Sequence, residues 1–125
     1  MTVIHEATMD NIDALITGNP VLVIDFWAPW CGPCRSFAPI FESAAADHPA
    51  IAFAKANTEA EQQLGAYFQI RSIPTLMIFR EQILIYSQAG ALPRAALDEL
   101  LGKVMALDMD KVREEIQASQ QQAQQ

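Results

Sequence analysis

The sequence has few cysteines, few basic residues and no long apolar segment, and each shortage excludes a class of protein. Cys31 and Cys34 are the only cysteines, too few for a disulfide-dense secreted scaffold. Eight basic residues stand against fifteen acidic ones, a net charge of −7, which argues against a nucleic-acid or anionic-membrane partner. The aliphatic stretch 21–24 is far too short to span a bilayer. Residues 1–10 lack the basic and apolar regions of a targeting signal, so we expect a cytoplasmic location.

The composition is that of one globular domain. Hydrophobic residues make up 51% of the 125 residues and charged residues 18%. A chain of this length buries roughly two-thirds of its unfolded surface, so it folds without disulfide staples.

Short apolar runs alternate with helical patterns along the chain, which predicts an α/β fold of order βαβαβαββα. Strands joined through helices are expected to run parallel, and the closing hairpin antiparallel. The result is a mixed central sheet flanked by helices on both faces. The expected strands are 3–5, 21–27, 51–56, 75–79 and 83–86, and the expected helices are 10–16, 31–47, 59–68 and one from about 93.

Three local features refine these helices. Pro39 lies inside the second helix and should kink it. Thr58 and Glu61 have the spacing of a capping box at the start of the third. The last helix is expected to bury an apolar stripe spaced three and four residues apart: Leu97, Leu100, Leu101, Val104 and Met105.

The chain divides into a domain over residues 1–107 and an extension over 108–125. Apolar residues at 105, 109, 112 and 116 continue a helical stripe into the extension, and glutamine fills six of the last nine positions. The extension can lengthen the last helix, fold back, pair with another chain, or remain a solvated, frayed or disordered tail.

The two cysteines lie where a buried strand is expected to turn into a helix. Cys31 falls at the helix N-terminus, where free N–H groups and the helix dipole stabilise a thiolate, the form that attacks disulfides. Cys34 lies one turn further on the same face, where it can attack a mixed disulfide formed at Cys31. The pair can therefore cycle between dithiol and disulfide.

Two other uses of this pair are weaker. A structural disulfide would close a loop of only four residues, worth roughly 2 kcal/mol. A zinc site would need two more ligands, and neither His5 nor His48 has ligand spacing to the cysteines. No metal is expected.

Asp25 interrupts an otherwise apolar strand, so both of its strand faces look buried. Burial should raise the pKa of this carboxyl toward neutrality, where it can accept and return the proton of the resolving thiol. Lys55, on the neighbouring strand, is either its charge partner or a solvated charge at the end of the strand.

Three motifs resemble the thioredoxin family. They are the run 25–34 (DFWAPWCGPC), the run 70–75 (IRSIPT) and the run 90–92 (GAL), and with the element order they cover about residues 3–107. The runs 37–42 and 57–61 are closer to the bacterial thioredoxin-2 branch. That branch typically carries an N-terminal zinc ribbon with two more C-x-x-C pairs, which this sequence does not contain, so no zinc-dependent property is carried over.

The resemblance implies roles for individual residues. Cys31 would be the nucleophile, Cys34 the resolving thiol and Asp25 the buried proton acceptor beside Lys55. Pro74 would be a cis-proline facing the cysteines. Trp27 and Pro39 would be structural. A flat apolar collar would dock client proteins, formed by Trp30, Gly32, Pro33, Ile73, Pro74, Thr75, Gly90 and Ala91.

The resemblance also implies an activity and partners. The protein would reduce protein disulfides as a monomer, with no bound cofactor, and an NADPH-dependent flavoprotein, thioredoxin reductase, would re-reduce its Cys31–Cys34 disulfide. Gly32-Pro33, with no histidine between the cysteines, favours a reductant with a potential near the family's −270 mV. The alternative is a co-chaperone that binds clients through the collar and the extension. The family's hairpin often has Asn-Gly where this chain has Glu81-Gln82, so we expect an altered turn.

Overall fold

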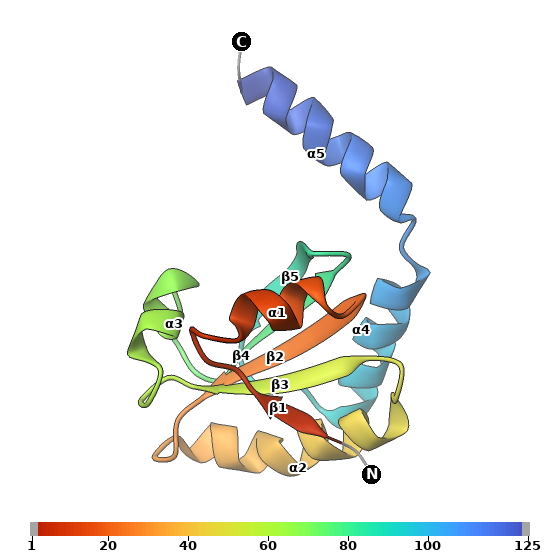
Figure 1. The fold of residues 1–125 in the computed structure, drawn as a ribbon. Helices are drawn as coiled ribbons and strands as arrows, with labels where there is room; N and C mark the ends of the chain where they lie inside the picture. The colour runs from red at the N-terminus through yellow and green to blue at the C-terminus, as the bar shows by residue number, and fades with distance from the viewer. Residues whose placement is uncertain (1–2, 124–125) are drawn as a thin grey trace.

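The computed structural model describes residues 3–123 and contains one five-stranded sheet in the order β1-β3-β2-β4-β5 (Figure 1). Its strands are β1 (Ile4–Glu6), β2 (Val21–Trp27), β3 (Ala52–Asn57), β4 (Thr75–Arg80) and β5 (Ile83–Ala89). Its helices are α1 (Ile12–Thr17), α2 (Gly32–Asp47), α3 (Gln62–Tyr67), α4 (Arg94–Ala106) and α5 (Met109–Ala123). The predicted α/β order is confirmed, with α5 added at its end.

Helices cover both faces of this sheet. On one face α2 and α4 enclose a core that includes Val23, Phe37, Phe41, Phe53 and Leu101. On the other face α1 and α3 cover a second core, which includes Leu15, Ile24, Phe26, Leu64 and Met77. The central strand β2 is apolar on both sides for this reason, and its first six residues are buried.

The direction of β4 corrects one expectation. β1, β2 and β3 are mutually parallel, but β4 runs antiparallel to β2 although a helix connects it to β3. The six residues of α3 span only about 9 Å, too short to carry the chain back along the sheet. β4 therefore starts at the end where β3 finishes.

Two expected side-chain arrangements are wrong. The third helix starts at Gln62, with no side-chain cap, and the Thr58 hydroxyl donates to the carbonyl of Trp27 instead of capping it. Met105 is 45% exposed because it lies beyond the buried stripe of Leu97, Leu101 and Val104. Pro39 lies within α2, which continues through it.

The β4–β5 turn keeps a two-residue form without glycine. Arg80 pairs with Ile83, and Glu81 and Gln82 between them have φ of 51° and 69°. Positive φ at both positions is what a tight hairpin requires, and it costs non-glycine residues conformational energy. The family's glycine is lost, but the positive φ is kept.

α5 is a separate helix rather than an extension of α4. The Arg80 guanidinium donates to the carbonyls of Val104 and Leu107, which ends α4, and Asp108 accepts from the first N–H groups of α5. Met109 is buried, and beyond it α5 projects away from the domain (Figure 1). The predicted glutamine-rich tail is thus helical to Ala123, and its last two positions lie outside the described residues. Within the described chain, no helix is long and apolar enough to cross a membrane.

Candidate active site

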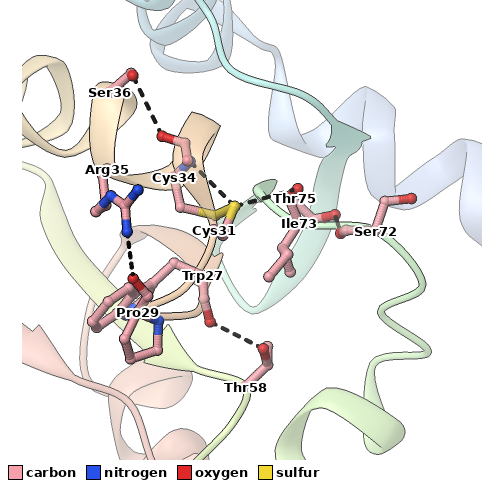
Figure 2. The surroundings of a disulfide bond; sticks show 11 residues. Trp27, Pro29, Cys31, Cys34, Arg35, Ser36, Thr58, Ser72, Ile73 and Thr75 are labelled. Atoms are coloured by element: carbon pink, nitrogen blue, oxygen red, sulfur yellow. Dashed lines mark hydrogen bonds between the residues drawn. A yellow bond between two sulfur atoms is a disulfide. The ribbon is translucent and has the colours of Figure 1, made fainter.

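The two cysteines are joined by a disulfide at the start of α2 (Figure 2). Cys31 is the N-cap residue, and the backbone N–H of Cys34 points at its Sγ from 3.2 Å. In the reduced protein the same N–H and the helix dipole would stabilise a thiolate at Cys31. Cys34 lies deeper, 2% exposed against 5% for Cys31, so Cys31 is the sulfur nearer to solvent.

Three hydrogen bonds hold the segment that leads into the disulfide. Arg35 Nη1 donates to the carbonyl of Pro29 at 3.2 Å. The carbonyl of Trp27 accepts from both the N–H and the hydroxyl of Thr58, at 2.8 and 3.0 Å. Sequence reasoning missed Arg35 and assigned Thr58 to a helix cap, because a side chain that binds a distant backbone carbonyl leaves no pattern in the sequence.

The segment 72–75 forms the wall opposite the disulfide. The Ile73–Pro74 peptide bond is cis, as the resemblance implies, and the Ile73 carbonyl oxygen lies 3.8 Å from Cys31 Sγ (Figure 2). The Pro74 carbonyl accepts from the N–H of Gly90 at 2.8 Å, which brings the 90–91 segment to the same place. Gly90 has φ of 107°, a conformation that favours glycine. The three motifs thus meet around one disulfide.

The predicted collar surrounds this disulfide unevenly. Trp30 is 67% exposed, so it is a surface residue rather than part of the core. Gly32, Pro33, Gly90 and Ala91 are also exposed, and Ile73 is half-buried. Pro74 and Thr75 are buried and add little side-chain surface. Trp30 and Ile73 also line a hollow that extends to α3, together with Thr58, Gly65, Ala66, Ile70 and Arg71.

Asp25 is fully buried on the sheet face covered by α2, the helix that carries Cys34. Among the described residues neither of its carboxylate oxygens has a hydrogen-bond partner. Burial raises the pKa of Asp25 to about 7, against a smaller lowering by the charge of Lys55. A carboxyl with this pKa exchanges its proton at neutral pH.

Lys55 is half-buried on the strand beside Asp25. It pairs in register with Asp25 on the adjacent parallel strand, so the two side chains share a face of the sheet. Its Nζ lies 4.6 Å from the centroid of the Trp27 ring. The charge of Lys55 thus lowers the pKa of Asp25, and its ammonium lies over the ring of Trp27.

No group of three or more metal-ligating side chains is found among residues 3–123. His48 lies at the far end of α2 from the cysteines, where its Nε2 is 3.0 Å from Asp98 Oδ1.

Known proteins match this chain both in sequence and in structure. Residues 3–103 match the family model described as Thioredoxin. A Streptomyces coelicolor protein, provisionally named thioredoxin 2, is 49% identical over 123 residues, which is 98% of this chain and 92% of that protein. A thioredoxin from Porphyra purpurea is 43% identical over 70% of this chain and 81% of its own. The solved structure of a mutant thioredoxin from Halobacterium salinarum superposes with a TM-score of 0.76 at 28% identity, covering 82% of this chain and 91% of that one.

Proposed function

Because this chain belongs to the thioredoxin family and is thereby a protein-disulfide reductase, we propose how its residues share the reaction. Cys31 is the attacking nucleophile and Cys34 the resolving thiol. The observation that supports this order is their placement, with Cys31 nearer to solvent at the N-cap of α2 and Cys34 buried behind it. The domain over residues 1–107 carries the chemistry.

In the first step the Cys31 thiolate attacks one sulfur of a client disulfide. A bond forms between Cys31 Sγ and that sulfur, the client S–S bond breaks, and the other client sulfur leaves as a thiolate. The N–H of Cys34, 3.2 Å from Cys31 Sγ in the disulfide, supports the attacking thiolate.

In the second step the Cys34 thiol gives its proton to the Asp25 carboxylate and attacks Cys31 Sγ. The Cys31–Cys34 bond forms, the mixed disulfide breaks, and the second client thiolate leaves. Two electrons have then passed from the cysteine pair to the client. Burial of Asp25 without a hydrogen-bond partner supports its part, because its pKa of about 7 lets it take and return a proton at neutral pH.

Clients dock as extended segments across the collar. Trp30 supplies exposed apolar area, and Ile73, whose carbonyl lies against Cys31, supplies backbone groups that a client strand can pair with. Trp27 and Lys55 have a structural role beside Asp25, and Pro39 has one inside α2.

We further propose that an NADPH-dependent thioredoxin reductase returns electrons to the Cys31–Cys34 disulfide, without a cofactor bound to this domain. The cytoplasm, where such a supply keeps thiols reduced, is the compartment that suits a reductant. Gly32-Pro33 between the cysteines supports this direction, as in reducing members of the family.

Insulin reduction driven by dithiothreitol tests this function. The wild type should accelerate precipitation of the insulin B chain, and Cys31→Ser should not. Equilibration with glutathione should give a potential near −270 mV, whereas a value near −120 mV would make the protein an oxidant. Normal turnover by Cys31→Ser would refute the proposal.

A second candidate, client holding without redox chemistry, is favoured by α5, which lies outside the family match yet projects from the domain with Val112 half-buried and Ile116 37% exposed. A Cys31→Ser/Cys34→Ser protein would then suppress aggregation of unfolded clients, and removal of residues 108–125 would abolish this.

A further inference from the structure

A row of three charged residues crosses the sheet from its edge to the buried acid. Glu6 of β1 pairs in register with Lys55 of β3, and Lys55 pairs in register with Asp25 of β2, all through parallel strands. Parallel partners in register share a face, so the three side chains stand on the face covered by α2. Lys55 thus has a carboxylate neighbour on each side.

The two carboxylates differ in their access to water. Glu6 is exposed at the edge of the sheet, whereas Asp25 is fully buried. A hollow at this edge is lined by both Glu6 and Lys55 and reaches Trp27, whose ring stands under the Lys55 ammonium. The Lys55 side chain therefore lies between the open edge and the buried acid.

Other titratable groups near Lys55 are placed less directly. Glu42 of α2 and Glu61 line the same hollow, and Glu61 already accepts from the backbone N–H of Met9. His5 also borders the hollow but alternates to the opposite face of β1. Glu6 alone of these shares a register row with Lys55 and Asp25.

We infer that Glu6 is a positioning residue for proton transfer at Asp25: its carboxylate competes for the Lys55 ammonium and so sets the pH range in which Asp25 accepts the proton of Cys34. The inference rests on the proposed function for its catalytic consequence. With Glu6 ionised, Lys55 is shared between two carboxylates and stabilises the Asp25 anion less. Without that charge, Lys55 favours Asp25 alone and the carboxyl ionises at lower pH.

The test compares Glu6→Gln with Glu99→Gln, which makes the same change in net charge on an exposed residue of α4. The ¹³C shift of the Asp25 carboxyl is followed against pH in the reduced proteins. A direct field across two strand spacings, about 10 Å, accounts for a fall of only about 0.3 pH unit in the Asp25 midpoint. Because Glu6 also acts through Lys55, Glu6→Gln should lower the midpoint by more than about 0.6 pH unit, twice the direct effect, and Glu99→Gln should leave it unchanged.

The same measurement in a Lys55→Gln background separates action through Lys55 from a direct field. Lys55→Gln alone should raise the Asp25 midpoint, and adding Glu6→Gln should then lower it by less than half of its effect in the wild type. Equal shifts from Glu6→Gln and Glu99→Gln, or a full shift without Lys55, would overturn the inference. Because the readout is a titration, either result stands apart from the insulin assay that tests the function itself.

Discussion

Aspartates near the two ends of the sheet differ in how they are paired. At the reactive end β2 leads into α2 and the cysteines; at the opposite, far end lie the last turn of α2 and the β4–β5 turn. Where β2 runs into α2, Asp25 is buried, and its carboxylate has no hydrogen-bond partner among the described residues. At the far end of α2, Arg94 of α4 binds both Asp47 and Asp98, and His48 lies 3.0 Å from Asp98. Among the described residues Asp25 thus has no hydrogen-bond partner, only the nearby charge of Lys55, whereas Asp98 has two hydrogen-bond partners.

The two arrangements move two aspartate pKa values in opposite directions. Burial raises that of Asp25 to about 7, whereas hydrogen bonds from His48 and Arg94 lower that of Asp98. In the proposed mechanism Asp25 therefore exchanges its proton at neutral pH, whereas the lowered pKa of Asp98 keeps that carboxyl ionised. The proposed reactivity thus depends on a buried carboxyl without a hydrogen-bond partner, whereas paired side chains join α2 to α4.

Cys34→Ser should have the largest effect, because it removes the thiol that is proposed to break the mixed disulfide between Cys31 and the client. Turnover should fall by about 10³-fold, and the client should accumulate as a mixed disulfide on Cys31. Non-reducing electrophoresis of the variant with an oxidised client measures the trapped complex, which Cys31→Ser should not form. A Cys34→Ser protein that turns over normally would show that Cys34 does not resolve the intermediate.

Asp25→Asn should stabilise the protein, and only at high pH. The pKa of Asp25 is raised on folding from 3.8 to about 7, so the wild type loses stability as pH rises through that interval. The variant should be more stable by roughly 4 kcal/mol at pH 8 and nearly equal at pH 4. Urea unfolding at the two pH values measures this, and a pH-independent difference would argue against a neutral buried acid.

Gln82→Gly tests whether the β4–β5 turn, at the far end of the sheet, is strained by its two non-glycine residues at positive φ. Glycine should relieve the cost at Gln82 and stabilise the protein by about 1 kcal/mol, with insulin reduction unchanged. The unfolding temperatures of the variant and the wild type measure this difference. A lower unfolding temperature for the variant would mean that positive φ at Gln82 carries no such cost.

Arg94→Gln should have the smallest effect. It removes exposed ion pairs between α2 and α4, so we expect a slight fall in unfolding temperature and no change in turnover. Since the pKa of Asp98 is lowered on folding, its contribution is present above pH 3.8 and is lost as pH falls below that value. The difference between variant and wild type should therefore vanish in acid. A loss of turnover would show that the ion pairs of Arg94 affect the chemistry at the Cys31–Cys34 disulfide.

The sequence predicts the reactive end better than the far end. Cys31, Cys34 and Asp25 were identified because a strand-to-helix turn and an acid within an apolar strand leave clear patterns. The cis bond before Pro74 came only from the family resemblance, since local chemistry favours trans. Other features depend on how segments distant in sequence come together, which no local pattern encodes. These are the direction of β4, the hydrogen bonds of Arg35 and Thr58, and the ion pairs around Arg94.

The most direct test of this account is the rate at which a client leaves its mixed disulfide with Cys31, measured from pH 5 to 9 for the wild type and Asp25→Asn. We predict a wild-type rate that rises through a midpoint near pH 7, the pKa of Asp25, and a slower variant in which this midpoint is absent. Superimposable profiles would contradict the account, because the buried carboxyl would then take no part in the chemistry.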